Sequence, residues 1–210
     1  PLGAMSSIHS PLQELLKTKR RKMENLIKVD TILFFDMDGT LIDTDYSNFL
    51  SYKKAIHSVT NNGIHLSFDP KNRFNRSLLK IALPNLTKVD YEKIIQKKEE
   101  YYEGFLTETK LNEEIADVLN KFSKTNKTFL VTNCRKDRVL MTLNHFGLTE
   151  KFDGIFYRKI TDKKEKVNKF QNAISELGIS PNLVIAFEYE KIEIEYAKKA
   201  GIKIINPMIY

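Results

Sequence analysis

"ILFFDMDGTLIDTD", residues 32–45, sets a run of four apolar residues directly against two acids and a glycine. Such a run is typical of a strand buried in a parallel sheet, and sheets of that kind bind ligands beyond the carboxyl ends of their strands. Because side chains alternate along an extended chain, Asp36 and Asp38 can face one crevice, and Gly39 allows the chain to turn sharply there. The stretch therefore predicts a ligand site at the end of the first strand.

Short apolar runs bounded by polar or turn residues predict five strands in all, at 31–35, 128–132, 154–157, 183–187 and 203–206. Helical patterns separate the later runs. The glycines that follow these helices are natural C-caps: Gly147, Gly178 and Gly201. Repeats of strand and helix of this length predict an α/β fold with a Rossmann-like, doubly wound parallel sheet.

The segment between the first two strands is far longer than one crossover helix requires. Amphipathic spacing in "NFLSYKKAIHSV" (48–59) and in the stretches that follow it predicts a mainly helical insert. We therefore predict a helical cap domain at 44–109 and an α/β core formed by 30–43 and 110–210. Residues 1–29 would add an N-terminal extension with an amphipathic helix, and 1–4 resemble the remnant of a cleaved tag.

The composition is that of an ordinary globular chain, since 210 residues of which 41% are hydrophobic can bury a sizeable core. No apolar run of about eighteen residues and no secretory signal is present, so neither a membrane span nor export is expected. The single cysteine, Cys134, cannot form an internal disulfide and excludes a zinc site made of several cysteines. These features predict a cytoplasmic protein without a membrane partner, in which any metal is held by oxygen atoms.

The net charge of +7 invites a nucleic-acid interpretation, and "KTKRRK" at 17–22 is the only dense basic tract. No RNA-binding aromatic signature or helix-turn-helix pattern accompanies this tract, and a small anionic substrate would equally favour a positive chain. We therefore do not expect nucleic acid as a partner. The sequence does not indicate an oligomeric state.

Two neighbouring carboxylates repel each other unless a cation lies between them. Mg²⁺ prefers oxygen ligands and commonly uses one or two carboxylates together with phosphate oxygens. Asp36, Asp38, Mg²⁺ and a phosphorylated ligand would therefore complete one site. The alternative for a bare Asp-x-Asp pattern is a pair of acids that caps a turn.

Three stretches together resemble the haloacid dehalogenase-like (HAD) superfamily, and specifically its capped phosphatases of the phosphoglycolate phosphatase and β-phosphoglucomutase type. "FFDMDGTLIDTD" is similar to the family's first motif, which follows a hydrophobic strand. "FLVTNC" is similar to the second motif, a strand that ends in Thr or Ser, and "VIAFEYEKIEIEYAKKAGI" to the fourth. The order of the motifs and their places at strand ends agree. An insert directly after the first motif resembles the family's helical cap.

The resemblance implies a role for each matching residue. Asp36 would attack phosphorus as the nucleophile and bind Mg²⁺, and Asp38 would act as general acid and base with its backbone carbonyl on the metal. Thr132 would bind phosphoryl oxygens, or alternatively its hydroxyl would only bond its own turn. The further residues that we place around the substrate are Gly39, Thr40, Asn133 and Lys164.

The family also uses a lysine that neutralises the nucleophile and the phosphoryl group, and "TDKKEKVNKF" (161–170) offers several. The spacing common in capped members would select Lys164, whereas Lys166 and Lys169 suit shorter variants. We favour Lys166 or Lys169 as the catalytic lysine. Two residues could be the N-cap that puts a lysine at a helix start: Asp162 and Asn168.

The fourth motif departs from the family's pattern. Glu188 matches an acid, but Tyr189 stands where an aspartate is usual and cannot supply a carboxylate. Glu188 could bind Mg²⁺ or hold its waters, or it could be a surface acid after a strand. The change predicts weaker metal binding than the family pattern would give.

We expect a Mg²⁺-dependent phosphomonoester hydrolase that acts on a small phosphorylated metabolite through an aspartyl-phosphate. The alternative is a catalytically weakened module that binds a phosphorylated ligand or partner. A phosphomutase ranks third, because such relatives carry a histidine in the first cap helix where this chain has Asn48, and a neutral amide cannot transfer a proton. Three cap residues could contact a distal anionic group or could form a solvated face: Arg73, Arg76 and Lys80.

Overall fold

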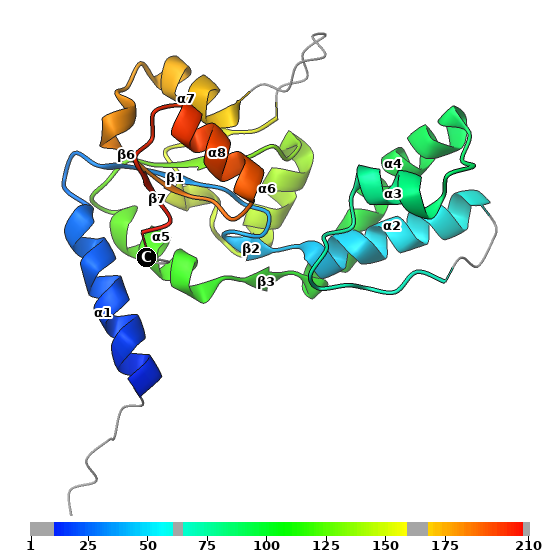
Figure 1. The fold of residues 1–210 in the computed structure, drawn as a ribbon, viewed down its shortest axis with the longest axis horizontal. Helices are drawn as coiled ribbons and strands as arrows, with labels where there is room; N and C mark the ends of the chain where they lie inside the picture. Colours follow the sequence, from blue (N-terminus) through cyan, green and yellow to red (C-terminus); the bar gives the residue numbers. More distant parts are fainter. Residues whose placement is uncertain (1–10, 61–64, 159–167, 208–210) are drawn as a thin grey trace, which may run out of the picture.

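The computed structural model describes residues 11–60, 65–158 and 168–207. These residues form an α/β core and a helical cap that lies to one side of it, while a helix at the N-terminal end projects from the core on the other side (Figure 1). Two short strands connect the core to the cap. The predicted fold class, a Rossmann-like sheet with an inserted helical cap, is confirmed.

The core sheet has five parallel strands in the order β5-β4-β1-β6-β7. All five predicted strands are present, each shorter than predicted by one or two residues. Their bounds are β1 (Ile32–Phe35), β4 (Thr128–Val131), β5 (Gly154–Phe156), β6 (Val184–Phe187) and β7 (Ile204–Ile205). The first strand therefore lies in the middle of the sheet, so that the acids after it are flanked by the ends of β4 and β6.

Helices cover both faces of this sheet, because successive side chains of a strand point to opposite faces. Leu33 and Phe35 of β1 join one apolar cluster with residues of α5 and α6, whereas Phe34 joins a second cluster with residues of α7 and α8. The core helices are α5 (Glu113–Phe122), α6 (Lys136–His145), α7 (Lys169–Leu177) and α8 (Lys191–Lys199), with short 3₁₀ turns at Thr149–Lys151 and Pro181–Leu183.

The cap is bounded by an antiparallel pair of two-residue strands, β2 (Ile42–Asp43) and β3 (Lys110–Leu111), in which Ile42 pairs with Leu111. The sequence predicted no strand at either place, because two residues are too few to show an alternating pattern. Between these strands lie α2 (Asp45–Thr60), α3 (Arg76–Ala82), α4 (Lys88–Tyr102) and a 3₁₀ segment at Glu103–Glu108. The chain thus leaves the core and returns to it through adjacent strands.

The cap has an apolar cluster of its own, separate from the two clusters of the core. Its fully packed members are Tyr52, Ala55, Ile56, Leu79 and Ile94. Rings from α2 and from the segment before α3 surround the cluster; for example, the rings of Tyr52 and Phe74 lie 5.1 Å apart. These contacts hold α2, α3 and α4 together as one unit.

The helix α1 (Pro11–Leu26) contacts the core through its C-terminal end, where Met23 and the following Ile27 are buried. Arg20 Nη1 lies 3.0 Å from the Asp117 carboxylate of α5, so part of the basic tract at 17–22 is paired within the protein. No helix in residues 11–60, 65–158 or 168–207 combines the length and the apolar character needed to cross a membrane.

Candidate active site

A cavity opens at the carboxyl ends of β1, β4 and β6, where the cap faces the core. Parallel sheets place their ligand sites at this edge. Core residues and cap residues both line the cavity. From the core these include Asp36, Asp38, Thr132, Asn133, Lys169 and Glu188, and from the cap Asn48, Tyr52, Arg73, Arg76 and Lys98.

Asp36, Lys169 and Glu188 form a buried ion-paired group at the centre of the site. Lys169 Nζ donates to Asp36 Oδ1 and to Glu188 Oε2, each at 2.6 Å. All three side chains are buried. The strands β1 and β6 bring the two carboxylates together, and α7 supplies the ammonium group between them.

Burial and the charges of the neighbouring side chains together set the pKa values of this group. Burial raises the pKa of Asp36, although the Lys169 ammonium opposes the change. Burial and the nearby Asp36 carboxylate raise the pKa of Glu188 to about 7. For Lys169, burial alone would lower the pKa, but the two carboxylates outweigh it and raise the pKa. One ammonium therefore stabilises two acids that would otherwise repel each other.

The position of Glu188 is fixed by hydrogen bonds around its backbone and carboxylate. Asn206, after β7, accepts from the Glu188 N–H at 2.7 Å and donates to the Glu188 carbonyl. Glu188 Oε1 accepts from the N–H groups of Tyr189 and Glu190 at 2.8 and 2.9 Å. Asn206 has φ of 49°, a left-handed conformation that Asn tolerates better than most residues. These bonds leave Oε2 directed at Lys169.

Lys169 is the first residue of α7, and Asn168 is the N-cap of that helix. The Asn168 side chain accepts from the N–H groups of Phe170 and Gln171, and its amide donates to the Tyr196 carbonyl of α8 at 2.8 Å. The structure thus brings Lys169 to the site. The other candidate lysines, Lys164 and Lys166, and the alternative cap Asp162 lie outside the described residues.

Asp38 is surrounded by donors on one carboxylate oxygen. Thr44 donates its hydroxyl to Asp38 Oδ1, Arg138 Nη2 lies 2.8 Å from the same oxygen, and Arg73 Nη2 lies 3.3 Å from it. Burial would raise the pKa of Asp38, but the Arg138 and Arg73 guanidinium groups outweigh burial and lower it. Asp38 is therefore held as a carboxylate in this arrangement.

The remaining predicted residues lie in the turns around these acids. Thr132 lines the cavity, and its hydroxyl accepts from the Cys134 N–H at 3.2 Å, as in the turn-bonding alternative. Gly39 has φ of 83°, which confirms the sharp turn after the first motif. Thr40 is buried below that turn, and its carbonyl accepts from the Asn112 side chain at 3.0 Å. Gly39 and Thr40 are not among the residues that line the described cavity.

The donors at this site fit a divalent cation of the Mg²⁺ type. Asp36 and Glu188 share one ammonium, so their carboxylates lie within reach of a common cation, and hard oxygen ligands of this kind are those that Mg²⁺ prefers. No group of three or more His, Cys, Asp or Glu side chains placed to hold a metal occurs within the described ranges. The expected ligands of the cation are only two carboxylates, those of Asp36 and Glu188, together with the backbone carbonyl of Asp38.

Tyr189 extends outward from the site, with 69% of its surface exposed. A Cβ atom on Gly39 would lie 3.7 Å from the Tyr189 ring and 4.0 Å from Arg73, so these two side chains flank the glycine turn. Glu190 and Glu193 also line the cavity and are the further acids of the fourth motif. The Tyr189 side chain takes no part in the buried ion-paired group.

Several residues that the structure places here had no role assigned from their sequence context. Arg138 is the clearest case, since it lies with Thr142 on a buried face of α6. A cation at an otherwise apolar helix position was a signal for it. Thr44 and Asn206 carried no pattern that distinguishes them from ordinary polar residues.

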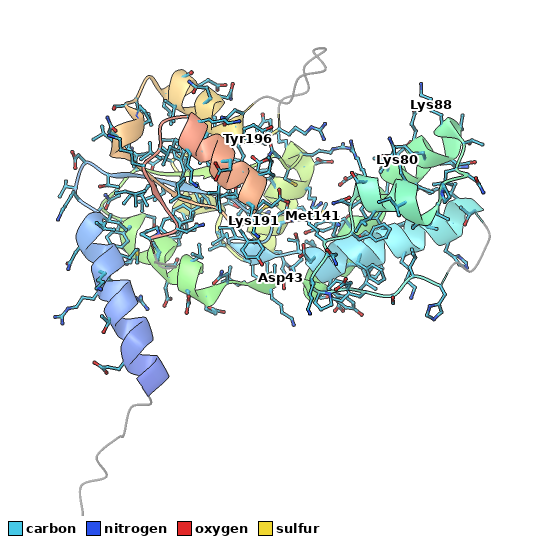
Figure 2. The ribbon with its side chains drawn as sticks, viewed as in Figure 1. Asp43, Lys80, Lys88, Met141, Lys191 and Tyr196 are labelled. Atoms are coloured by element: carbon cyan, nitrogen blue, oxygen red, sulfur yellow. The ribbon has the colours of Figure 1, made fainter. Side chains whose placement is uncertain are left out.

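The cap candidates differ in where they lie. Arg73 contacts the acids Asp38 and Asp45, and Arg76 lines the cavity. Lys80 lies on the cap away from the sheet (Figure 2), with its Nζ 5.1 Å from the centre of the Tyr91 ring, so a solvated face is the better description for this lysine. The Asn48 amide donates to the Phe74 carbonyl at 2.7 Å, which is a structural bond within the cap.

An α/β core with an inserted cap and a buried acid–lysine group after the first strand defines a class of hydrolases, and comparisons with known proteins agree. Residues 33–206 match the family model of haloacid dehalogenase-like hydrolases. The chain is 27% identical over 186 residues to the phosphorylated carbohydrates phosphatase of Thermotoga maritima, with 85% of each chain covered. The protein therefore belongs to the haloacid dehalogenase-like hydrolase family, as its motifs indicated.

Solved structures show the same fold. A haloacid dehalogenase-like family hydrolase from Streptococcus pneumoniae is 21% identical with a TM-score of 0.65, covering 83% of this chain and 82% of that chain. A Haemophilus somnus protein described as a predicted phosphoglycolate phosphatase is 18% identical with a TM-score of 0.70, covering 83% of this chain and 84% of that chain. The likeness extends over the cap as well as the core, because it covers most of both chains.

Proposed function

We propose that the protein is a Mg²⁺-dependent phosphomonoester hydrolase that acts on a small phosphorylated metabolite through an aspartyl-phosphate. The observation that carries this proposal is the buried Asp36 at the end of β1, paired with Lys169, with Asp38 two residues further on. A carboxylate that attacks a phosphoryl group needs positive charge around it, because both groups are anionic. Lys169 supplies that charge directly.

Each residue of the site has a step in this reaction. Asp36 attacks phosphorus in line with the leaving oxygen, and the Asp36–phosphate bond forms as the ester bond breaks. Thr132 and Asn133 bind phosphoryl oxygens from the end of β4. Mg²⁺, held by Asp36, Glu188 and the Asp38 carbonyl, would screen the charge of the phosphoryl group.

Asp38 acts as the general acid and the general base of this reaction. Asp38 must be protonated when the leaving alcohol departs, because it gives that oxygen a proton, and it regains a proton from the water that cleaves the aspartyl-phosphate. The anionic phosphoryl group of a bound substrate would raise the pKa of Asp38 for the first step, because it adds negative charge beside the carboxyl group. Arg138 and Arg73 favour its carboxylate form, which suits the second of these steps. Thr44 orients the same carboxylate through its hydroxyl.

The named relative supports a phosphorylated small molecule as the substrate, because the Thermotoga maritima protein is described as a phosphatase of phosphorylated carbohydrates. The weakened-module alternative is suggested by Tyr189, which stands in place of a usual acid of the fourth motif, and by the basic helix α1 and the net charge of +7. No described contact favours a phosphomutase, since Asn48 is engaged within the cap.

The test is Mg²⁺-dependent release of phosphate from p-nitrophenyl phosphate and from acetyl phosphate. Asp36→Asn should reduce kcat by about 10³-fold or more, because an amide cannot form the acyl-phosphate bond. Asp117→Asn is the matched control, since Asp117 is a half-exposed acid on α5 that pairs with Arg20. Turnover that survives in folded Asp36→Asn would overturn the role of Asp36. A folded wild-type protein without any turnover would favour the weakened module.

A further inference from the structure

The cap contains a cavity of its own, which we call the cap cavity. It has a volume of about 380 Å³ and lies between the first half of α2, the segment that leads to α3, and α3 itself (Figure 1). Among the described residues, Phe74 alone lines both this cavity and the candidate active site. Proteins commonly bind small molecules in cavities of about 300–1,000 Å³. The cap cavity is therefore large enough for a ligand and distinct from the candidate active site.

Three phenylalanine rings form much of the wall of the cap cavity. The ring centre of Phe49 lies 5.5 Å from that of Phe68 and 6.1 Å from that of Phe74, with angles of 52° and 73° between the ring planes. Phe49 is buried, whereas Ile81 on the α3 side of the cavity is 73% exposed, so the cavity opens to solvent. Because the three rings are inclined to one another, a further aromatic ring can stack on one and meet the edge of another. The wall thus favours a flat aromatic group.

Asp69 is the one charged residue that lines the cap cavity in the described part of the chain. Its carboxylate accepts from the Lys71 N–H at 2.9 Å and from the Asn72 side chain at 2.7 Å. The Asn72 bond, and after it the Lys71 bond, lowers the pKa of Asp69. No lysine or arginine within 11–60, 65–158 or 168–207 forms an ion pair with this carboxylate. Its negative charge is therefore available to a cationic ligand.

We propose that the cap cavity binds a small aromatic amine, with the aromatic ring among the three phenylalanines and the ammonium group toward Asp69. The inference goes beyond the proposed hydrolase function and does not depend on it, because none of the reacting residues takes part. An ammonium group beside these rings is attracted by their faces as well as by the carboxylate. A neutral aromatic ligand gains only from the rings, and an anionic one is repelled by Asp69. All lining residues belong to the cap of one chain, so the site needs no second copy.

The first experiment titrates the wild-type protein with phenethylamine and follows its backbone amide signals by NMR. We expect a Kd of about 1 mM or lower, with the largest shifts at Phe68, Asp69 and Leu78. Phenethyl alcohol lacks the charge and cyclohexylethylamine lacks the aromatic ring, so each should bind about threefold more weakly or worse. Equal affinity for phenethylamine and either analogue, or no shift at these three amides, would overturn the proposal.

The variant Asp69→Asn tests the place of the ammonium group. It keeps an oxygen that can accept from the Lys71 N–H but loses the charge, so the preference for phenethylamine over phenethyl alcohol should disappear. Glu92→Gln is the matched control, because Glu92 is an exposed acid on α4 outside the lining of the cap cavity. The control should keep the preference. A preference that survives in folded Asp69→Asn would overturn the role of Asp69.

The variant Ala82→Phe tests the place of the ring. Ala82 is an exposed residue at the end of α3 that lines the cap cavity, so a larger side chain there can fill the space, and phenethylamine should bind about tenfold more weakly or worse. Ser77→Phe is the control, because it adds the same ring at an exposed position of α3 outside the lining. Unchanged affinity in folded Ala82→Phe would overturn the proposed place of the ring. Should Ala82→Phe not fold, the amide shifts of the wild-type protein decide.

Two competing explanations have their own outcomes. Inorganic phosphate, added to occupy the candidate active site, should leave phenethylamine bound, because the two cavities share only Phe74 among the described residues. Displacement of the amine by phosphate would place it at the candidate active site and overturn the proposal. Shifts of the same amides with rising protein concentration, without any amine, would mean that a second copy covers the cap cavity and would overturn it as well.

Discussion

Glu188 is the residue on which the proposed metal site depends most, because its neighbour Tyr189 has no carboxylate. The side chain of Glu188 is buried against Lys169, while that of Tyr189 points outward and is largely exposed. Few carboxylates are therefore left for a cation at the end of β6. Metal affinity at this site should respond strongly to either residue.

Glu188→Gln should raise the Mg²⁺ concentration needed for half-maximal rate by about 10- to 100-fold, because one of two carboxylate ligands is lost. Tyr189→Asp should lower it, since the exposed tyrosine can be replaced without leaving a cavity and its N–H still donates to Glu188. Activity is titrated against Mg²⁺ for both variants, with folding checked by circular dichroism. If Glu190→Gln or Glu193→Gln shifts the curve and Glu188→Gln does not, the metal ligand lies further along the chain.

The acids of the candidate site could be found from the sequence. Asp36 and Glu188 each follow an apolar strand directly, and Asp38 stands two residues after Asp36. The lysine could only be narrowed to three candidates, since spacing along a polar stretch does not show which ammonium reaches the sheet. That Arg73 and Arg138 both contact Asp38 could not be predicted. Arg138 reaches it across the cavity from a helix, and Arg73 lies 35 positions along the chain in an irregular segment, so their meeting depends on tertiary packing.

At the scale of elements, the first residues of α7 both begin the helix and place the lysine of the candidate active site. Lys169 is the first residue of that helix, so the Asn168 cap sets both where the helix begins and where the ammonium points. The Asn168 bond to Tyr196 also fixes α7 against α8. Loss of the Asn168 N-cap should therefore affect both the stability of the protein and its catalysis.

Asn168→Ala should lower the free energy of unfolding by about 1 kcal/mol and also lower kcat, because Lys169 is no longer held between Asp36 and Glu188. Urea unfolding and phosphate release measure the two effects. Thr87→Ala is the matched control, because Thr87 is the N-cap of α4 in the cap domain. Its hydroxyl accepts from the Asp90 N–H at 3.1 Å. The control should lose similar stability and keep its kcat. Equal losses of kcat in both variants would contradict the conclusion that the Asn168 N-cap positions Lys169.

The long elements followed from the sequence, and the shortest ones did not. Apolar runs gave the five core strands, and Gly147, Gly178 and Gly201 have the positive φ values of residues that end helices. The pair β2 and β3 could not be predicted, since its two strands are joined by pairing across the whole cap and carry no periodicity.

At the scale of the molecule, the cap and the core have separate apolar clusters. Leu79 is fully buried in the cap cluster. Units with their own cores can lose structure independently, because few apolar contacts cross between them. The cap should therefore open without unfolding of the sheet.

Leu79→Ala should destabilise the cap by about 2–5 kcal/mol, the range for deletion of a buried leucine side chain. Hydrogen exchange should then show loss of protection in α2, α3 and α4, with β1, β4 and β6 unchanged. Ile81→Ala is the control, because Ile81 lies on the same helix with 73% of its surface exposed. Equal loss of protection in the sheet would mean that cap and core unfold as one unit.

The pair β2 and β3 also has a mechanical consequence. Because the chain leaves and re-enters the core through these two adjacent strands, the cap can rotate about a single hinge (Figure 1). The helix α2 has 16 residues, and at about 1.5 Å per residue it extends about 24 Å from that hinge. A rotation of about 10° would move its far end by about 4 Å, from the same helix length. Arg73 contacts Asp38, close to the pivot, so the far end of the cap can travel widely while the contacts next to the reacting groups shift little.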